Sequence, residues 1–133
     1  MLLDTNVLSE LPRRRPNPKV VRWCSALEEV HLSVITLEEL AFGIARAPLS
    51  ARPRLQGWME ALLKSRPVVH PVTAEVARTS GELRAARESR GRRVAQADML
   101  IAATALVHGL ALATRHGSDF EGCGVALIDP WKA

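Results

Sequence analysis

Short apolar runs alternate with segments of helical periodicity along almost the whole of this 133-residue sequence. The runs are rich in branched residues and have the length of strands, whereas the segments between them repeat apolar residues at helical spacing. Such alternation is typical of βαβ units with parallel strands. We therefore predict an α/β fold, with a central parallel sheet flanked by helices. The predicted strands are residues 1–4, 30–35, 68–72, 110–114 and 125–128, and the predicted helices are residues 19–27, 36–46, 55–63, 73–89 and 96–108.

The organisation predicted for residues 1–133 is a single domain, because the length suits one domain and no internal repeat or low-complexity tract divides it. Residues 9–18 hold three prolines and the run Arg13–Arg15, which favours a loop or a broken helix. The apolar stripe of the helix at 55–63 is predicted to belong to the core. Any exposed part of it would suit a dimer or a partner helix lying in a groove.

The charge balance is basic, with 18 Lys and Arg against 14 Asp and Glu and a pI near 9.8. Most of these bases are Arg, whose planar fork of donors matches phosphate oxygens. This composition is compatible with a nucleic-acid partner, although a preference of the host for Arg codons explains it equally well. The longest apolar run, Met99–Val107, is too short to span a membrane. Cys24 and Cys123 lie far apart without a paired motif, so we expect a cytoplasmic protein without disulfides or a thiolate zinc site.

Four acidic residues stand where a parallel α/β sheet gathers its functional side chains. Asp4 ends the first predicted strand, Glu39 lies in the first turn after the second, and Asp98 lies in the first turn of the apolar helix. Asp119 follows the strand that ends at Thr114. Ligands bind at the carboxyl ends of parallel strands, so these acids can converge at one edge of the sheet. Clustered carboxylates repel one another, and a hard cation such as Mg²⁺ or Mn²⁺ relieves that repulsion.

Each acid also has an ordinary structural explanation. Asp98 and Glu39 would stabilise a helix dipole in a first turn, and Glu39 completes a capping-box pattern with Thr36. Asp4 fits an Asx turn, and Asp119 fits an exposed loop. Only the joint placement of the four acids favours chemistry. Together with the excess of Arg, it suggests metal-dependent phosphodiester cleavage.

Four sequence blocks resemble, in order and spacing, the motifs of PIN-domain ribonucleases. They are Leu3–Glu10 (LDTNVLSE), Ser33–Gly43 (SVITLEELAFG), Asp98–Ala105 (DMLIAATA) and Thr114–Phe120 (TRHGSDF). The chain is most similar to the VapC/FitB-type toxins of bacterial toxin–antitoxin pairs. One position departs from the family pattern: His116 stands where members usually carry Asn, in the turn before the fourth acid.

The resemblance implies a PIN-like three-layer α/β/α fold and a site in which Asp4, Glu39, Asp98 and Asp119 hold Mg²⁺ or Mn²⁺. It implies endonucleolytic cleavage of RNA, a homodimer, and a cognate antitoxin that blocks the site. We expect Thr5 and Thr114 to orient the carboxylates from behind the metal ligands. Arg92 and Arg93, just before Asp98, are expected to contact RNA phosphates. The run Arg13–Arg15 is a second basic group that could do so.

Two other functions use the same residues and stay open at this stage. A phosphatase or a DNA nuclease would employ the same acids on another substrate. A non-catalytic module that binds RNA or a protein partner would use the acids only as helix caps. His31, His70 and His108 show no ligand spacing and are expected to be structural.

Overall fold

A computed structural model describes residues Met1–Ala133 and shows one sheet of five short parallel strands. The order across the sheet is β3-β2-β1-β4-β5, so the first strand lies at the centre. This arrangement confirms the predicted α/β class. The strands are β1 (Leu2–Leu3), β2 (His31–Ser33), β3 (Val68–His70), β4 (Leu112–Ala113) and β5 (Leu127–Ile128).

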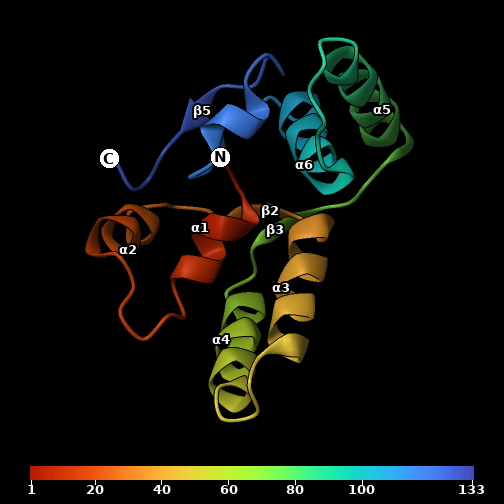
Figure 1. The fold of residues 1–133 in the computed structure, drawn as a ribbon. Helices are drawn as coiled ribbons and strands as arrows, with labels where there is room; N and C mark the ends of the chain where they lie inside the picture. The colour runs from red at the N-terminus through yellow and green to blue at the C-terminus, as the bar shows by residue number, and fades with distance from the viewer.

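Helices cover both faces of the sheet and make the fold three-layered (Figure 1). The chain moves outward from β1 to β2 and β3, then crosses back to β4 on the other side of β1. This reversal creates a switch point between β1 and β4, where open α/β sheets bind their ligands. The helices are α1 (Thr5–Glu10), α2 (Pro18–Ser25), α3 (Val34–Arg46), α4 (Arg52–Lys64), α5 (Ala74–Glu88) and α6 (Gln96–Val107), with a 3₁₀ helix η1 (Gly117–Phe120) before β5.

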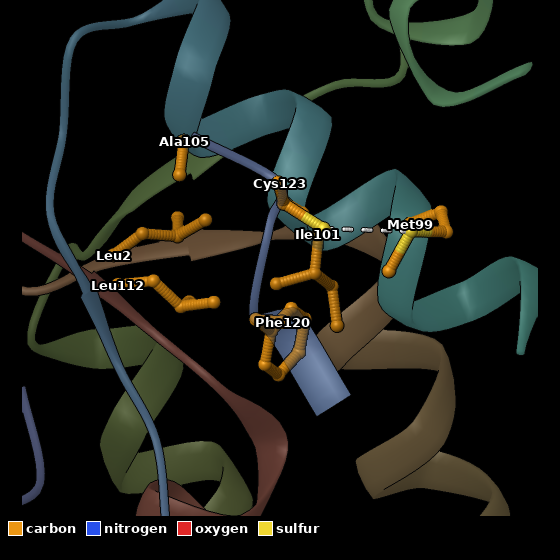
Figure 2. Close-up of a cluster of buried hydrophobic side chains, with 8 residues drawn as sticks. Leu2, Met99, Ile101, Ala105, Leu112, Phe120 and Cys123 are labelled. Carbon is orange, nitrogen blue, oxygen red and sulfur yellow. Dashed lines mark hydrogen bonds between the residues drawn. The ribbon is translucent and has the colours of Figure 1, made fainter. Parts of the chain in front are cut away.

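Two apolar clusters, one for each face, hold the layers together. On one face α6 presents Met99, Ile101 and Ala105 to Leu2, Leu112 and Phe120 (Figure 2). The other cluster comprises Leu3, Val7, Leu8, Val20, Leu32, Leu40 and Ala113. Successive residues of a strand point to opposite faces, which is why Leu2 and Leu3 belong to different clusters. Helix α6 is buried along most of its length, as its nearly continuous apolar sequence requires.

Three predicted boundaries, those of β2, α3 and the segment after Asp4, were wrong. Strand β2 ends at Ser33, not at Ile35, because the Ser33 hydroxyl caps α3 by accepting a hydrogen bond from the Ile35 N–H at 3.0 Å. Helix α3 therefore begins at Val34, two residues before Thr36. Residues 9 and 10 belong to α1, which starts at once after Asp4, so the irregular segment is shorter than predicted.

Helix α4 contributes to the core only in part. Trp58, Met59 and Leu62 pack against the Leu3 cluster, but no residue of α4 is fully buried and Leu63 is 46% exposed. In Figure 1, α3 and α4 lie side by side and project away from the sheet. The prediction that this stripe is core holds for its inner residues, and its outer edge is left uncovered. No helix of the protein has the length and apolar character needed to cross a membrane.

Candidate active site

The strand register brings Asp4 and Thr114 together at the carboxyl edge of the sheet. Leu2 pairs with Leu112 and Leu3 with Ala113, so the next residues of the two strands lie side by side. Accordingly the Thr114 hydroxyl donates a hydrogen bond to Asp4 Oδ2 over 2.8 Å. Both side chains belong to buried residues, and both follow the switch point between β1 and β4.

Asp4 is held by three donors that fix both of its carboxylate oxygens. The Thr5 N–H donates to Oδ1 at 2.8 Å, and Asn6 Nδ2 donates to Oδ2 at 2.9 Å beside the Thr114 hydroxyl. Burial raises the pKa of Asp4 above its usual 3.8, and these hydrogen bonds, with the nearby His116, oppose that rise. The carboxylate is therefore rigidly oriented although burial disfavours its charge.

Glu39 reaches the same region from α3. Its Oε1 accepts a hydrogen bond of 2.6 Å from the hydroxyl of Thr5, which also lies 3.2 Å from the hydroxyl of Thr36. The capping-box explanation of Glu39 was wrong, because the helix starts earlier and Ser33 is its N-cap. Thr36 is buried inside the helix, so Glu39 is turned toward α1 by Thr5 and does not cap its own helix.

Asp98 is the acid most affected by the others. It lies in the first turn of α6, as predicted, and the capping residue Ala95 offers no side-chain hydrogen bond there. Burial, followed by the negative charges of Asp4, Asp119 and Glu39, raises the pKa of Asp98 to about 6 against the opposing effect of His116. Asp98 therefore lies within electrostatic reach of all three other acids.

Asp119 enters from η1 and is exposed. Its backbone N–H donates to the His116 carbonyl at 3.0 Å, and the His116 N–H donates to the Thr114 hydroxyl at 3.1 Å. Thr114 thus links the turn that carries Asp119 to Asp4. His116 precedes the first residue of η1, so its backbone acts as the turn residue that its position in the sequence suggests.

All four predicted acids line one hollow of about 300 Å³. Thr5 lines it too, whereas Thr114 lies behind Asp4. No Lys or Arg is among the lining residues, so no fixed positive side chain compensates the acids there. The oxygen donors are those that Mg²⁺ and Mn²⁺ prefer. As they stand, no three His, Cys, Asp or Glu side chains of the protein are arranged to enclose one metal ion.

From the sequence, no role in the site was assigned to Asn6. Its amide binds Asp4 and Thr114, and its Oδ1 accepts the Arg115 N–H at 3.1 Å, so one side chain joins the two strand ends. Ser9 lines the hollow one turn further along α1 and was missed altogether. The helical spacing of residues 5, 6 and 9 was the signal, but it is legible only once α1 is known to start at Thr5.

The two arginines expected to contact phosphate lie outside this hollow. Arg92 Nη2 donates to the Ser118 carbonyl at 3.3 Å, and Arg92 Nη1 lies 3.9 Å from the Glu121 carboxylate. Arg92 and Arg93 line a separate surface depression with Glu88 and Gly91. Arg92 therefore borders the turn that carries Asp119 without facing the acids.

A second cluster of titratable side chains joins three histidines from distant segments. His31 Nδ1 lies 2.9 Å from His70 Nε2, and the His70 and His108 rings lie 4.2 Å apart between centroids. The outer nitrogen of His31 lies 3.1 Å from Glu29 Oε2. Their sequence positions did not predict this cluster. It has no metal-binding arrangement, and both ring nitrogens of His31 have partners, one in His70 and one in Glu29.

Comparisons with known proteins give the same family as the four sequence blocks. The PIN domain family model matches residues 1–122. A VapC ribonuclease from Sinorhizobium fredii is 39% identical, over 99% of this chain and 98% of its own length. Toxin FitB from Neisseria gonorrhoeae is 38% identical, over 98% of each chain. The crystal structure of FitAcB from Neisseria gonorrhoeae superposes with a TM-score of 0.84, at 37% identity over 99% of both chains. The chain therefore belongs to the PIN-domain family and is similar in sequence and fold to its VapC- and FitB-type members.

Proposed function

We propose that this protein is an endoribonuclease that depends on Mg²⁺ or Mn²⁺ and acts as the toxin of a toxin–antitoxin pair. The observation that carries the proposal is the acid hollow, in which four carboxylates from distant segments line one space that no Lys or Arg lines. Membership of the PIN-domain family and likeness to a VapC ribonuclease and a FitB toxin support nuclease chemistry and the toxin role.

The chemistry of the donor set fits a hard divalent ion. Asp4 and Asp98 would hold the ion directly, and Glu39 and Asp119 would complete the site directly or through water. Mg²⁺ keeps several of its own waters, so it does not require three side chains to contact it at once. When bound, the ion would neutralise charge that builds on the phosphate and lower the pKa of an attacking water.

The remaining residues of the site orient and stiffen the acids. Thr114 and Asn6 hold the Asp4 carboxylate in one rotamer, and Thr5 holds Glu39. Such supporting hydrogen bonds commonly influence metal affinity and activity by 10- to 100-fold. Arg92 would act from the rim, because its hydrogen bond to the Ser118 carbonyl holds the turn that carries Asp119.

The uncovered edge of the α3–α4 pair is the proposed docking place for the antitoxin. A groove of about 480 Å³ between the two helices is lined by Ala41, Ile44, Ala45 and Met59, with Gln56 and Glu60 at its polar side. Nearby, Phe42 is 56% and Leu49 78% exposed. An amphipathic helix with an apolar stripe fits such a groove. Homodimer formation, which the family resemblance implies, is proposed alongside it.

The direct test is cleavage of defined RNAs by the purified chain, with Mg²⁺, with Mn²⁺ and with EDTA. Single-stranded DNA and a phosphomonoester are assayed in parallel, because a DNA nuclease or phosphatase would use the same acids. The proposal expects RNA cleavage that EDTA abolishes and added Mg²⁺ restores. Cleavage that is indifferent to EDTA, or hydrolysis of only the other two substrates, would contradict it.

A further inference from the structure

Three hollows follow one another from the acids toward the C-terminus. The acid hollow shares His116 with a second hollow of about 480 Å³, formed by the turn after β4 and the end of β5. The second hollow shares Arg115 with a third of about 450 Å³, formed by the loop from Arg13 to Pro18 and by Trp131. Each hollow shares one lining residue with the next, so the three adjoin in a row, and we call the second and third together the groove.

Three of the four Lys and Arg side chains that line this groove form no ion pair. Arg15, Arg115 and Lys132 line it and form no ion pair, whereas Arg13 is bound to the buried Glu10 at 3.0 Å. Glu10 is itself engaged twice, since it also accepts the Asn17 N–H at 2.7 Å and thereby shapes the loop.

Two further acids, Glu121 and Asp129, line the second hollow. Asp129 accepts the backbone N–H of Trp131 at 2.9 Å, and Glu121 lies 3.9 Å from Arg92 Nη1, so both acids also have partners. The groove thus offers three cations without ion pairs to a polyanion.

Arg115 and Trp131 form a flat platform in the middle of the groove. The guanidinium carbon of Arg115 lies 5.0 Å from the centre of the Trp131 ring, within the range of a cation–π contact. The platform is fixed from both sides. The Trp131 side chain packs against the Leu3 cluster, and its backbone N–H donates to Asp129 Oδ1 at 2.9 Å. The backbone N–H of Arg115 donates to Asn6 Oδ1. Asn6 also binds Asp4, so the platform and the acids share an anchor.

We propose that this groove binds the single-stranded RNA that flanks the scissile phosphate. In it the Arg115–Trp131 platform stacks one unpaired base, and Arg15 and Lys132 contact the backbone. Guanidinium planes and indole rings stack on bases that have left a helix, and cations follow the backbone without reading sequence. The inference rests on the proposed function, because it takes RNA as the substrate of the acid hollow. The substrate class it names is RNA that is unpaired beside the cut.

The structure favours this route over the one past Arg92 and Arg93. The depression formed by those two residues shares no lining residue with the acid hollow, and Arg92 is already bound to Ser118 and close to Glu121. The groove, by contrast, adjoins the acid hollow at His116, which lines both. The two routes therefore differ in which arginine substitutions should weaken RNA binding.

The test measures RNA binding separately from cleavage. Asp98→Asn serves as the parent, so that a labelled, unstructured RNA of about eight nucleotides stays intact, a length within the usual range of single-strand sites. Fluorescence anisotropy in Mg²⁺ gives the affinity over a range of salt. Arg15→Ala with Lys132→Ala is expected to lower the slope of log K against log salt by about 1.4, since each single-strand phosphate contact contributes about 0.7. Lys64→Ala with Arg78→Ala, which removes an exposed Lys of α4 and an exposed Arg of α5, is the charge-matched control.

Stacking is tested by a double-mutant cycle that combines a Trp131 substitution in the protein with the removal of bases from the RNA. Trp131→Leu is expected to weaken binding of the ordinary RNA about tenfold. It should leave an abasic RNA of the same length unaffected, because no base remains to stack. Trp131→Phe keeps an aromatic ring and should recover most of the loss. Thermal melting of every variant separates this effect from unfolding, since Trp131 also packs against the core.

Several outcomes would overturn the groove. They are groove variants that bind RNA like the parent, a Trp131→Leu loss that is equal for abasic RNA, and duplex RNA bound as tightly as single strands. If RNA binding were weakened only by Arg92→Ala and Arg93→Ala, the RNA would lie in the depression after α5 instead. Failure of the proposed function looks different. If the wild-type chain binds RNA through the groove but never cuts it, the proposed nuclease activity is wrong and the proposed RNA-binding groove is still supported.

Discussion

The acid hollow and the histidine cluster are built alike but balanced differently. Each gathers titratable side chains from three or more distant segments of the chain. In the histidine cluster, His31 contacts both His70 and Glu29, so its ring nitrogens have partners within the protein. In the acid hollow, Asp98 faces three negative charges and no Lys or Arg lines the space.

The difference separates a structural cluster from a functional one. Side chains that satisfy one another need nothing from outside, whereas uncompensated carboxylates raise one another's pKa and lower stability until a cation arrives. Perturbed pKa values of this kind concentrate at functional sites. The comparison therefore predicts that removing an acid changes catalysis greatly, and that removing a histidine changes only stability.

The largest effect is expected from Asp98→Asn. The amide keeps the shape of the side chain but removes the charge that would hold the ion, so RNA cleavage should fall at least ~1000-fold, equivalent to a loss of several kcal/mol of charge stabilisation. Gel-based cleavage in Mg²⁺ measures it, and circular dichroism verifies the fold. Glu75→Gln is the matched control, because Glu75 is also an acid in the first turn of a helix. Full activity of Asp98→Asn would refute the assignment of the site.

A smaller loss is expected when a supporting hydrogen bond is removed. Thr114→Val keeps the side-chain volume but deletes the hydroxyl that binds Asp4 and receives the His116 N–H. Cleavage should fall about 10- to 100-fold, and the Mg²⁺ concentration needed for half-maximal rate should rise. A titration of rate against Mg²⁺ distinguishes this role from a purely structural one. Loss of thermal stability with an unchanged Mg²⁺ requirement would show that Thr114 only supports the strand end.

The repulsion among the acids also predicts that the metal-free protein becomes more stable when the charge of Asp98 is removed by substitution. The pKa of this carboxyl is about 6 in the folded state against 3.8 for the free group, so folding disfavours its ionised form. The cost is absent below pH ~4, grows as the pH rises, and is complete above pH ~6. In EDTA at pH 7, Asp98→Asn should therefore raise the free energy of unfolding by ~1–2 kcal/mol, allowing for partial exposure, and should raise it little at pH 4. Urea denaturation at both pH values tests this, and equal effects at the two would contradict it.

The sequence was sufficient to predict the architecture, because the patterns that indicate it extend over many residues. The alternation of strands and helices, the apolar body of α6 and the placement of four acids at strand ends depend on patterns over many residues. They led to the parallel sheet and to the group of acids that line one hollow. The four-block resemblance added the family, which spacing alone does not name.

The sequence could not show in the same way which of several suitable residues caps the N-terminus of α3. Ser33, Thr36 and Glu39 all suit a helix N-terminus, and only the strand register shows that Ser33 takes that position and frees Glu39. The histidine cluster is invisible to spacing, because β2, β3 and the end of α6 meet only after the sheet forms. The groove of Arg115 and Trp131 depends likewise on where the last turns of the chain lie.

The smallest effect is expected from the histidine cluster, where His70→Val removes the central ring. Its loss deletes the 2.9 Å contact with His31, which should lower the free energy of unfolding by about 1 kcal/mol at pH 7.5. Burial, with the charges of His108, His31 and the N-terminal amine, lowers the pKa of His70 below 6.5 against the weaker opposing charge of Glu29. Protonation therefore opposes folding, and wild-type stability should fall as the pH drops below about 6.5. The difference between His70→Val and wild type, measured by urea denaturation, should accordingly shrink at pH 5.5, while RNA cleavage at pH 7.5 stays unchanged. A large loss of cleavage would place the histidines in the active machinery and remove the distinction between the two clusters.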